Sequence, residues 1–408
     1  MRTISQSKFS RRQFLKALGV VAAGYATSPL LSACNSSGSA GAVRIGVLLP
    51  FSDIYAVLGE NISEGLKMYF DEVNNEAAGR PLELIIEDTE IKPDVAQQKA
   101  RKLVEQDEVD LLAGVVSSGV LLGLRDYLIE TRSLLICANA GANQLSRELK
   151  TPYIWRTSFT NWMIHWPIGD WAAKNVGKRA YITVPDYAAG ENALSAFTNS
   201  FEAAGGEIIG VQRTPFPNMG DPAPFVAELA SANPDFVYAW YSGSSAVTFV
   251  KAYHDFGIGD TLPLVTSGFT VGEDVRPAQG EAARGIYNSL HWTPLLDNSE
   301  NKTFMAAYQE RTGSPPDVYS VQGYDTGRVI VDMLTAVQGD TTNVDRMIDS
   351  LSGISFKSPR GPFALDANSQ APRQNMYLFQ VQEINGNLEN AVLDNLGEIV
   401  DPGDDSKG

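Results

Sequence analysis

The sequence is poor in residues on which much enzyme chemistry depends. Its 408 residues include two cysteines and three histidines. The histidines, His165, His254 and His291, lie far apart, and none forms the His-Glu-x-x-His spacing of zinc hydrolases. No Gly-x-Ser-x-Gly motif, which presents the nucleophilic serine of many hydrolases, occurs either. These absences weigh against catalysis, so we expect a protein that is not an enzyme and that needs no metal or cofactor.

Basic residues are also in deficit. Lysine and arginine number 32 against 48 acidic residues, which gives a net charge of −16. The first 33 residues hold five of the basic residues and no acid, so a chain that has lost them carries about −21. Nucleic acid and anionic lipid surfaces repel such a charge, and we exclude both as electrostatic partners.

The N-terminus carries an export signal. Residues 10–16 read Ser-Arg-Arg-Gln-Phe-Leu-Lys and resemble the twin-arginine motif, with Arg11 and Arg12 as the arginine pair. The apolar run 17–31 that follows has about fifteen residues, which is shorter than the roughly twenty of a membrane span. A signal peptide over residues 1–33 is therefore predicted, with export by the twin-arginine route.

The end of this signal resembles a lipobox, Leu31-Ser32-Ala33-Cys34. We expect Cys34 to become the lipidated first residue of the mature chain, and residues 34–42 to form a flexible linker at the membrane surface. Lipidation of Cys34 leaves Cys137 without a disulfide partner, and the apolar run 134–138 favours a buried, unreactive thiol there. A cytoplasmic amphipathic helix and an uncleaved anchor are the alternatives to this signal.

The rest of the chain alternates strands with helices. Roughly 365 residues exceed one ordinary core, so two domains are expected. Hydrophobic periodicity predicts strands at 43–49, 82–87, 109–116 and 134–137, with helices at 59–74, 94–106 and 119–131. A second series begins near Asn161, with strands at 180–184, 207–211, 235–240 and 262–266. This pattern predicts an α/β protein of two Rossmann-like lobes with parallel central sheets and a cleft between them.

A ligand site is expected at the carboxyl ends of these strands. Ser117 and Ser118 follow one strand directly and precede a helix, so their hydroxyls and the helix N-terminus can hold an anion; a plain serine N-cap is the alternative. The loop from Asn139 to Asn143 closes the next strand. Aromatic side chains fall on loops or strand ends expected to face the same cleft, namely Tyr55, Phe159, Trp162, Tyr187, Trp240, Tyr241 and Phe269. Together these predict a small carboxylate with an aromatic or apolar body as ligand.

Several segments in order resemble one family. They are 45–50, 55–60, Glu87-Asp88 with Pro93, 102–103, 109–110, 114–119, 152–158 and 323–325. The stretch from Ile45 to about Val381 is similar to the substrate-binding proteins of ABC importers for branched-chain amino acids and amides, which have the type I periplasmic binding fold. The resemblance implies three crossings of the chain between the lobes at a hinge. Lobe 1 would take residues 43–159 and 291–353, and lobe 2 residues 160–290 and 362–402.

The resemblance also suggests roles for individual residues. In this family the loop at Ser117 and Ser118 holds the ligand carboxylate. Gly141 aligns with a threonine of the amino acid binders, so Asn139 is expected to donate instead. Asn161 and Ser267 stand where acids hold an ammonium group, which disfavours a free amino acid because a buried ammonium needs a charged partner. The predicted ligand-binding residues are Tyr55, Ser117, Ser118, Asn139, Ala140, Gly141, Asn161, Trp162, Tyr187, Trp240, Tyr241, Ser267 and Phe269.

The function that this predicts is capture and delivery. The protein would bind its ligand by hinge closure, as a monomer anchored on the outer face of the cytoplasmic membrane or in the periplasm, and pass it to an ABC permease with a separate ATPase subunit. A branched-chain amino acid or amide stays open as the ligand. The alternatives are a ligand-sensing receptor component and, less favoured, a lipid-anchored enzyme on the same scaffold.

Overall fold

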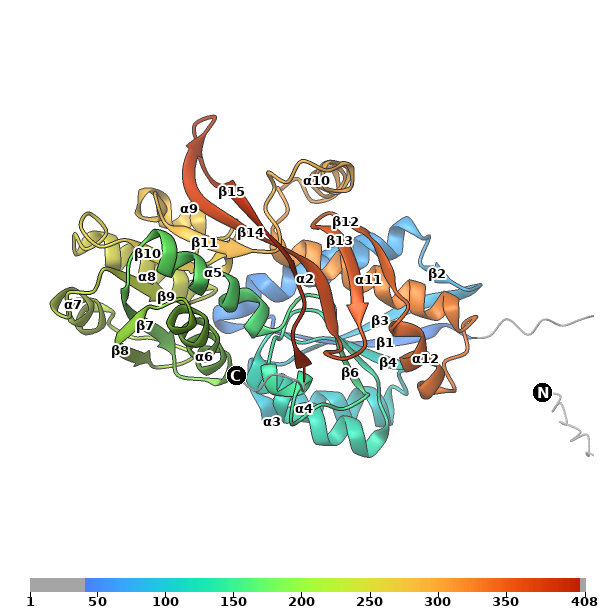
Figure 1. The fold of residues 1–408 in the computed structure, drawn as a ribbon. Coiled ribbons are helices and arrows are strands. Elements are labelled where there is room, and N and C mark those ends of the chain that lie inside the picture. The colour runs from blue at the N-terminus through green and yellow to red at the C-terminus, as the bar shows by residue number, and fades with distance from the viewer. Residues whose placement is uncertain (1–40, 404–408) are drawn as a thin grey trace, which may run out of the picture. The chain divides into compact units, whose positions relative to one another are not determined.

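The computed structural model describes residues 41–403 (Figure 1). The predicted signal peptide with Arg11 and Arg12, and the predicted lipidation site Cys34, lie outside the described residues. None of the helices within 41–403 combines the length and the apolar character that a membrane crossing requires.

The first lobe is built on a six-stranded sheet in the order β2-β3-β1-β4-β5-β6. Its strands are β1 (Val43–Leu49), β2 (Glu76–Ala77), β3 (Arg80–Asp88), β4 (Leu111–Gly114), β5 (Leu135–Cys137) and β6 (Ile154–Arg156). All neighbours are parallel except β2 and β3. Alternate residues of β1 enter two different cores, Val47 on one face and Leu48 on the other. The sheet is therefore buried on both faces, which explains its continuous apolar runs.

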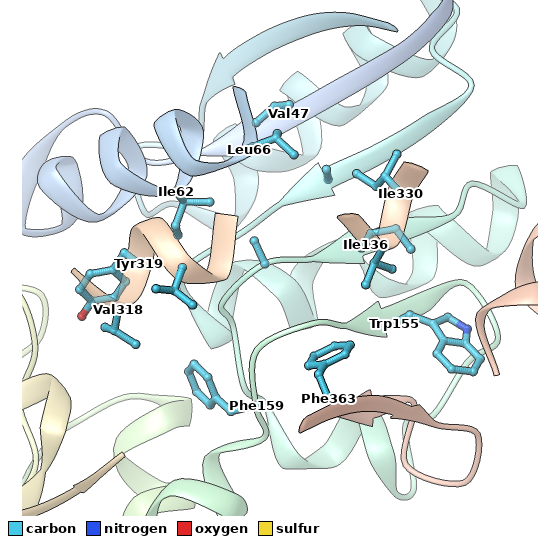
Figure 2. Packing of buried hydrophobic residues seen from close by; sticks show 14 of the residues in the cluster. Val47, Ile62, Leu66, Ile136, Trp155, Phe159, Val318, Tyr319, Ile330 and Phe363 are labelled. Carbon is cyan, nitrogen blue, oxygen red and sulfur yellow. The ribbon is translucent and has the colours of Figure 1, made fainter. Parts of the chain in front are cut away.

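The helices of this lobe pack on the sheet or on one another. They are α2 (Ala56–Glu72), α3 (Pro93–Arg101), α4 (Ser118–Thr131), α10 (Ser299–Thr312), α11 (Val318–Ala336) and α12 (Val344–Leu351). α2 and α11 pack closely, because a Cβ added at Gly65 or Gly323 would lie 2.0 Å from a carbonyl oxygen of the other helix. Figure 2 shows Ile62 and Leu66 of α2 in the same buried cluster as Ile330 of α11. This packing fixes the start of α11 beside the first sheet.

The second lobe is built on a nine-stranded sheet in the order β12-β13-β14-β11-β10-β9-β7-β8, with β15 paired to β14. Its strands are β7 (Arg179–Pro185), β8 (Glu207–Thr214), β9 (Phe236–Ala239), β10 (Leu264–Ser267), β11 (Tyr287–Leu290), β12 (Ser355–Ser358), β13 (Gly361–Asp366), β14 (Ala371–Ile384) and β15 (Asn387–Ile399). Its helices are α5 (Asn161–Asn175), α6 (Ala188–Ala203), α7 (Ala223–Ser231), α8 (Ser244–Asp255) and α9 (Arg276–Gln279). The predicted two-lobed α/β fold is confirmed, since every predicted strand and helix overlaps an observed one.

The central strands of the second sheet are parallel as predicted, and the C-terminal strands add antiparallel pairs. β14 pairs antiparallel with β11, β13 and β15, and β14 and β15 form the long red hairpin of Figure 1. Its turn is Asn385-Gly386, with φ of 53° and 84°. Asn-Gly is the strongest short-range hairpin signal, because both residues accept the positive φ that a type I′ turn requires. The hairpin turn could therefore be recognised in the sequence. It was not predicted, because the alternating strands and helices upstream favoured parallel pairing throughout.

The chain passes between the two sheets three times, after β6, after β11 and between α12 and β12. The C-terminal strands do not divide cleanly between lobes: Phe363 of β13 belongs to the second sheet but packs in the core of the first lobe (Figure 2). The proposed boundary of lobe 2 at residue 362 therefore remains a prediction.

Candidate functional site

A small cavity lies where loops of the two lobes meet. Its volume is about 20 Å³, far below the roughly 300–1,000 Å³ of ligand pockets, so its walls must move apart before a ring-sized ligand fits. Every lining residue is buried except Tyr187, which is half-buried. The lining residues are Tyr55, Leu58, Val116, Ser118, Asn139, Gly141, Phe159, Asn161, Tyr187, Ala189, Trp240, Ser242, Phe269 and Tyr319.

The N-terminus of α4 borders this cavity. After β4 the chain turns through Gly114 and Val115, with φ of 110° and 68°. A Cβ on Gly114 would lie 2.5 Å from the Leu48 carbonyl oxygen, so glycine is required for this close approach. The turn delivers Ser118 to the first position of α4, where the first backbone N–H groups have no partner within the helix. These N–H groups, the helix dipole and the Ser118 hydroxyl are groups that can together hold an anion.

Asn161 joins this end of the cavity to the second lobe. Its backbone N–H donates to the Gly141 carbonyl oxygen at 2.7 Å, and its Nδ2 donates to Ser118 Oγ at 3.3 Å and to Asn192 Oδ1 at 3.2 Å. A Cβ on Gly141 would lie 2.6 Å from both Asn161 Oδ1 and a ring carbon of Phe159. The threonine expected at this position in amino acid binders therefore does not fit beside this asparagine.

Aromatic rings form the other walls. Tyr187 stacks on Phe216, with ring centroids 3.9 Å apart and an angle of 7° between the ring planes. Its ring centroid lies 5.8 Å from that of Trp240, with 22° between the planes. Phe269 lies 5.1 Å from Phe159 and stacks on Tyr319 at 5.6 Å. These flat surfaces suit a planar ligand.

Contacts between the lobes close the cavity. Tyr55, in the loop after β1, shares a hydrogen bond of 3.0 Å with the Tyr187 hydroxyl and accepts one of 3.1 Å from Ser242 Oγ. Gly243 has φ of 58°, and a Cβ there would lie 2.2 Å from the Ile54 carbonyl oxygen. The loop after β9 therefore closes against the loop after β1 with no room for a side chain.

The lining carries no charged side chain. Burial raises the pKa of the Tyr55, Tyr187 and Tyr319 hydroxyls above the ordinary value of 10.0, so all three are neutral. With neither an acid nor a base among its lining residues, the cavity offers hydrogen bonds and the helix terminus to an anion.

Eight of the thirteen predicted ligand-binding residues line this cavity: Tyr55, Ser118, Asn139, Gly141, Asn161, Tyr187, Trp240 and Phe269. Phe159, expected among the cleft aromatics, also lines it. The structure brings them together because they follow the carboxyl ends of parallel strands or begin the helices after them.

The other five predicted residues lie elsewhere. Trp162 stacks on Trp166 one turn further along α5, at 5.2 Å. The Tyr241 hydroxyl bonds Thr183 and Thr214 inside the second lobe, because Tyr241 alternates in direction with Trp240. Ser267, still within β10, is fully buried. Ser117 and Ala140 are likewise buried but not among the lining residues.

Sequence reasoning missed five lining residues, Leu58, Val116, Ala189, Ser242 and Tyr319. Ser242 directly follows the Trp240-Tyr241 pair and could have been included with it. Tyr319 starts α11, whose N-cap Asp317 forms a capping box with Ser320. This box was a readable helix start, but only the packing of α11 on α2 brings it to the cavity.

Within residues 41–403, no cluster of three or more histidine, cysteine or acidic residues could hold a metal. Burial raises the pKa of the Cys137 thiol to about 12 and lowers that of His165 to about 3, so both are neutral at ordinary pH.

Comparison with known proteins gives consistent matches. A family model described as periplasmic binding protein matches residues 42–387, and one for the twin-arginine translocation signal matches residues 8–27. A Leu/Ile/Val-binding protein homolog of Brucella melitensis is 30% identical, over 92% of this chain and 96% of its own. A solute-binding protein of an R. palustris ABC transporter, solved with benzoate, is 35% identical with a TM-score of 0.84, over 89% of this chain and 99% of that one. Another from Rhodopseudomonas palustris BisB5, solved with 3,4-dihydroxybenzoic acid, is 29% identical with the same TM-score and the same coverage.

Proposed function

This chain belongs to the periplasmic binding protein family, and from that premise we propose that it captures a small aromatic carboxylate and delivers it to an ABC permease. It is a solute-binding protein and not an enzyme, and it carries a twin-arginine export signal. The choice of ligand rests on one observation above all. The cavity combines a helix N-terminus with flat aromatic walls and contains no carboxylate.

Two kinds of ligand compete for this site. The Brucella relative is named for leucine, isoleucine and valine, whereas the two Rhodopseudomonas proteins were solved with benzoate-type acids. An amino acid would bury its ammonium group beside Asn161 with no acid on the wall to pair with it, which is costly. An aromatic acid needs only the anion-binding end and the rings. The lining residues therefore favour an aromatic acid over an amino acid as the ligand.

We propose closure of the lobes as the mechanism. The carboxylate first docks at Ser118 and the α4 N-terminus in lobe 1. Lobe 2 then closes with Tyr187 and Trp240 over the ring, and the Tyr55–Tyr187 and Ser242–Tyr55 hydrogen bonds form. A ligand favours the closed state only through contacts that the open state lacks. The closed monomer is what the permease would recognise, and lipidated Cys34 would keep it at the membrane.

A thermal-shift panel tests the ligand class, because a ligand that binds the native state raises the melting temperature. The mature chain, from residue 34, is heated in the presence of benzoate, each hydroxybenzoate, leucine, isoleucine, valine or an aliphatic amide. The proposal predicts the largest rise with an aromatic acid. A panel in which only the branched-chain amino acids raise the melting temperature would refute it.

The anchor has its own test. Full-length protein expressed in a bacterium with a twin-arginine pathway should partition into a detergent phase, and the Cys34→Ser variant into the aqueous phase. Equal partition of the two would rule out lipidation at Cys34 while leaving the ligand proposal intact.

A further inference from the structure

Three buried asparagines connect the lobes beside the cavity. The side-chain oxygen of Asn192, on α6 of the second lobe, accepts a hydrogen bond of 3.0 Å from the backbone N–H of Asn143 in the first lobe. It accepts another, of 3.2 Å, from Asn161 Nδ2 at the start of α5. These bonds depend on the contact between the lobes, where α6 lies beside α4 (Figure 1).

The loop of the first lobe that carries Asn143 is held at two further points. Asn143 Oδ1 accepts a bond of 2.8 Å from the backbone N–H of Trp162, and the Gly141 carbonyl oxygen accepts one of 2.7 Å from that of Asn161. Neither Asn143 nor Asn192 is among the residues that line the cavity. A ligand therefore need not displace the bond between them.

The backbone N–H of Asn143 fixes the direction of the bonds in this chain. A backbone N–H can only donate, so the Asn192 atom that faces it is the side-chain oxygen. The Asn161 atom that faces this oxygen is therefore the amide nitrogen. That nitrogen also donates to Ser118 Oγ, at 3.3 Å. The Ser118 hydroxyl is thus an acceptor toward the protein.

This leaves the proton of the Ser118 hydroxyl for the cavity. Within residues 41–403 the only hydrogen bond of this side chain is the one that it accepts from Asn161. Without the Asn192 oxygen, the Asn161 amide could turn over and present its own oxygen to Ser118. The hydroxyl would then donate to Asn161 and could only accept from a ligand.

We propose that Asn192 is a positioning residue that makes Ser118 a hydrogen-bond donor when the lobes come together. This inference rests on the proposed function and adds a residue to its binding site, one that acts through Asn161 without touching the ligand. Contact between the lobes would then favour a ligand group that accepts at Ser118, as both oxygens of a carboxylate do, over a group that also donates.

Titration calorimetry of the mature protein with benzoate and benzamide tests this role. The two probes share a ring, but the carboxamide has one acceptor oxygen and an NH₂ donor in place of the two carboxylate oxygens. Asn192→Leu removes the acceptor at similar size. It should weaken benzoate binding about tenfold and lower the ratio of benzoate to benzamide affinity at least about fivefold.

Asn390→Leu is the matched control. Asn390 is a buried asparagine of the second lobe whose side chain bonds Asn288 and the Val271 carbonyl oxygen within that lobe. Its loss should leave the affinity ratio within about twofold of the starting protein. A folded Asn192→Leu variant that binds benzoate with an unchanged ratio would overturn the inference and leave the proposed function standing.

Hydrogen exchange measured by NMR tests the same bond without a ligand, because an amide proton exchanges faster once its acceptor is removed. Exchange at Asn143 should be at least about tenfold faster in Asn192→Leu, whereas Ala140, whose N–H donates to the Val115 carbonyl oxygen within the first lobe, should not change. Asn192→Asp retains an oxygen acceptor and should keep the Asn143 amide protected. If benzoate does not bind the starting protein, the proposed function fails. Unchanged exchange at Asn143 in Asn192→Leu would refute the role of Asn192 in either case.

Discussion

Both lobes line the cavity with loops that follow parallel strands, but the side chains on these loops differ in chemistry. Loops after β4 and β5 of the first sheet supply the small polar residues Ser118, Asn139 and Gly141. Loops after β7 and β9 of the second sheet supply the rings of Tyr187 and Trp240. The location of the site thus follows from the fold, since ligands of parallel sheets bind beyond the carboxyl ends of the strands. Its chemistry follows from a few loop residues.

The two walls are therefore suited to different parts of a ligand. A polar wall at a helix N-terminus holds an anion by fixed hydrogen bonds, and a wall of rings stabilises a flat body by contact and exclusion of water. Neither wall alone encloses a ligand. Each part of this comparison can be tested by altering one wall or the contact between them.

The largest effect is expected where the walls meet. Gly243→Ala places a Cβ 2.2 Å from the Ile54 carbonyl oxygen, at a residue with φ of 58°. The open form relieves this clash and the closed form cannot, so aromatic acid affinity measured by calorimetry should fall about 100-fold, or ~2.7 kcal/mol. Gly257→Ala is the control, because Gly257 has φ of 70° with no atom within 4 Å of the added Cβ. Equal affinity of both variants would mean that this loop contact does not govern closure.

The polar wall comes next. Replacing Ser117 and Ser118 together by alanine should weaken binding more than about tenfold, or ~1.4 kcal/mol, through loss of a hydrogen bond to a charged group. The geometry sharpens this prediction, because only Ser118 lines the cavity. Ser118→Ala alone should therefore reproduce the loss, and Ser117→Ala alone should bind normally. An intact affinity in the double variant would remove the anion site from this wall.

A smaller effect is expected at the hydroxyl contacts across the cleft. Tyr55→Phe removes the bonds to Tyr187 and Ser242, and should weaken binding about fivefold, or ~1 kcal/mol. Tyr253→Phe, which removes a buried bond to the Leu262 carbonyl oxygen within lobe 2, is the control for loss of a hydroxyl. If Tyr253→Phe weakens binding as much, the effect comes from lobe stability and not from closure.

The smallest effect concerns pH. Asp274 follows β10 in one lobe, and Asp317 precedes α11 in the other. Burial raises the pKa of both carboxyl groups. The charges of Asp317 and Glu273 raise the pKa of Asp274 further, and Arg276 lowers it. A raised pKa means that the native state holds protons which the unfolded chain has released, so stability falls as pH rises above the ordinary value near 3.8. Between pH 5 and pH 8 the melting temperature should therefore drop more for the unaltered chain than for Asp274→Asn. An equal drop in both would show that Asp274 does not hold such a proton.

Much of the fold could be predicted from the sequence, because most strands and helices show a clear hydrophobic pattern within their own segment. The buried strands of both lobes are continuous apolar runs, and the helices between them have regular spacing. The C-terminal hairpin was missed although its Asn385-Gly386 turn is a local signal, because the alternating strands and helices upstream favoured parallel pairing. The site was predictable where residues directly follow a strand, as at Ser118 and Trp240. The site was not predictable where the direction of a side chain determines whether it lines the cavity, as at Tyr241. It was also not predictable where a helix distant in sequence completes the wall, as at Tyr319.

The central claim is that this cavity receives an aromatic anion and not an amino acid. The most direct measurement is titration calorimetry of ligand-free mature protein with a hydroxybenzoate and with leucine under the same conditions. The hydroxybenzoate should bind at least about tenfold more tightly than leucine. Leucine binding as tightly as the hydroxybenzoate, or more tightly, would contradict it.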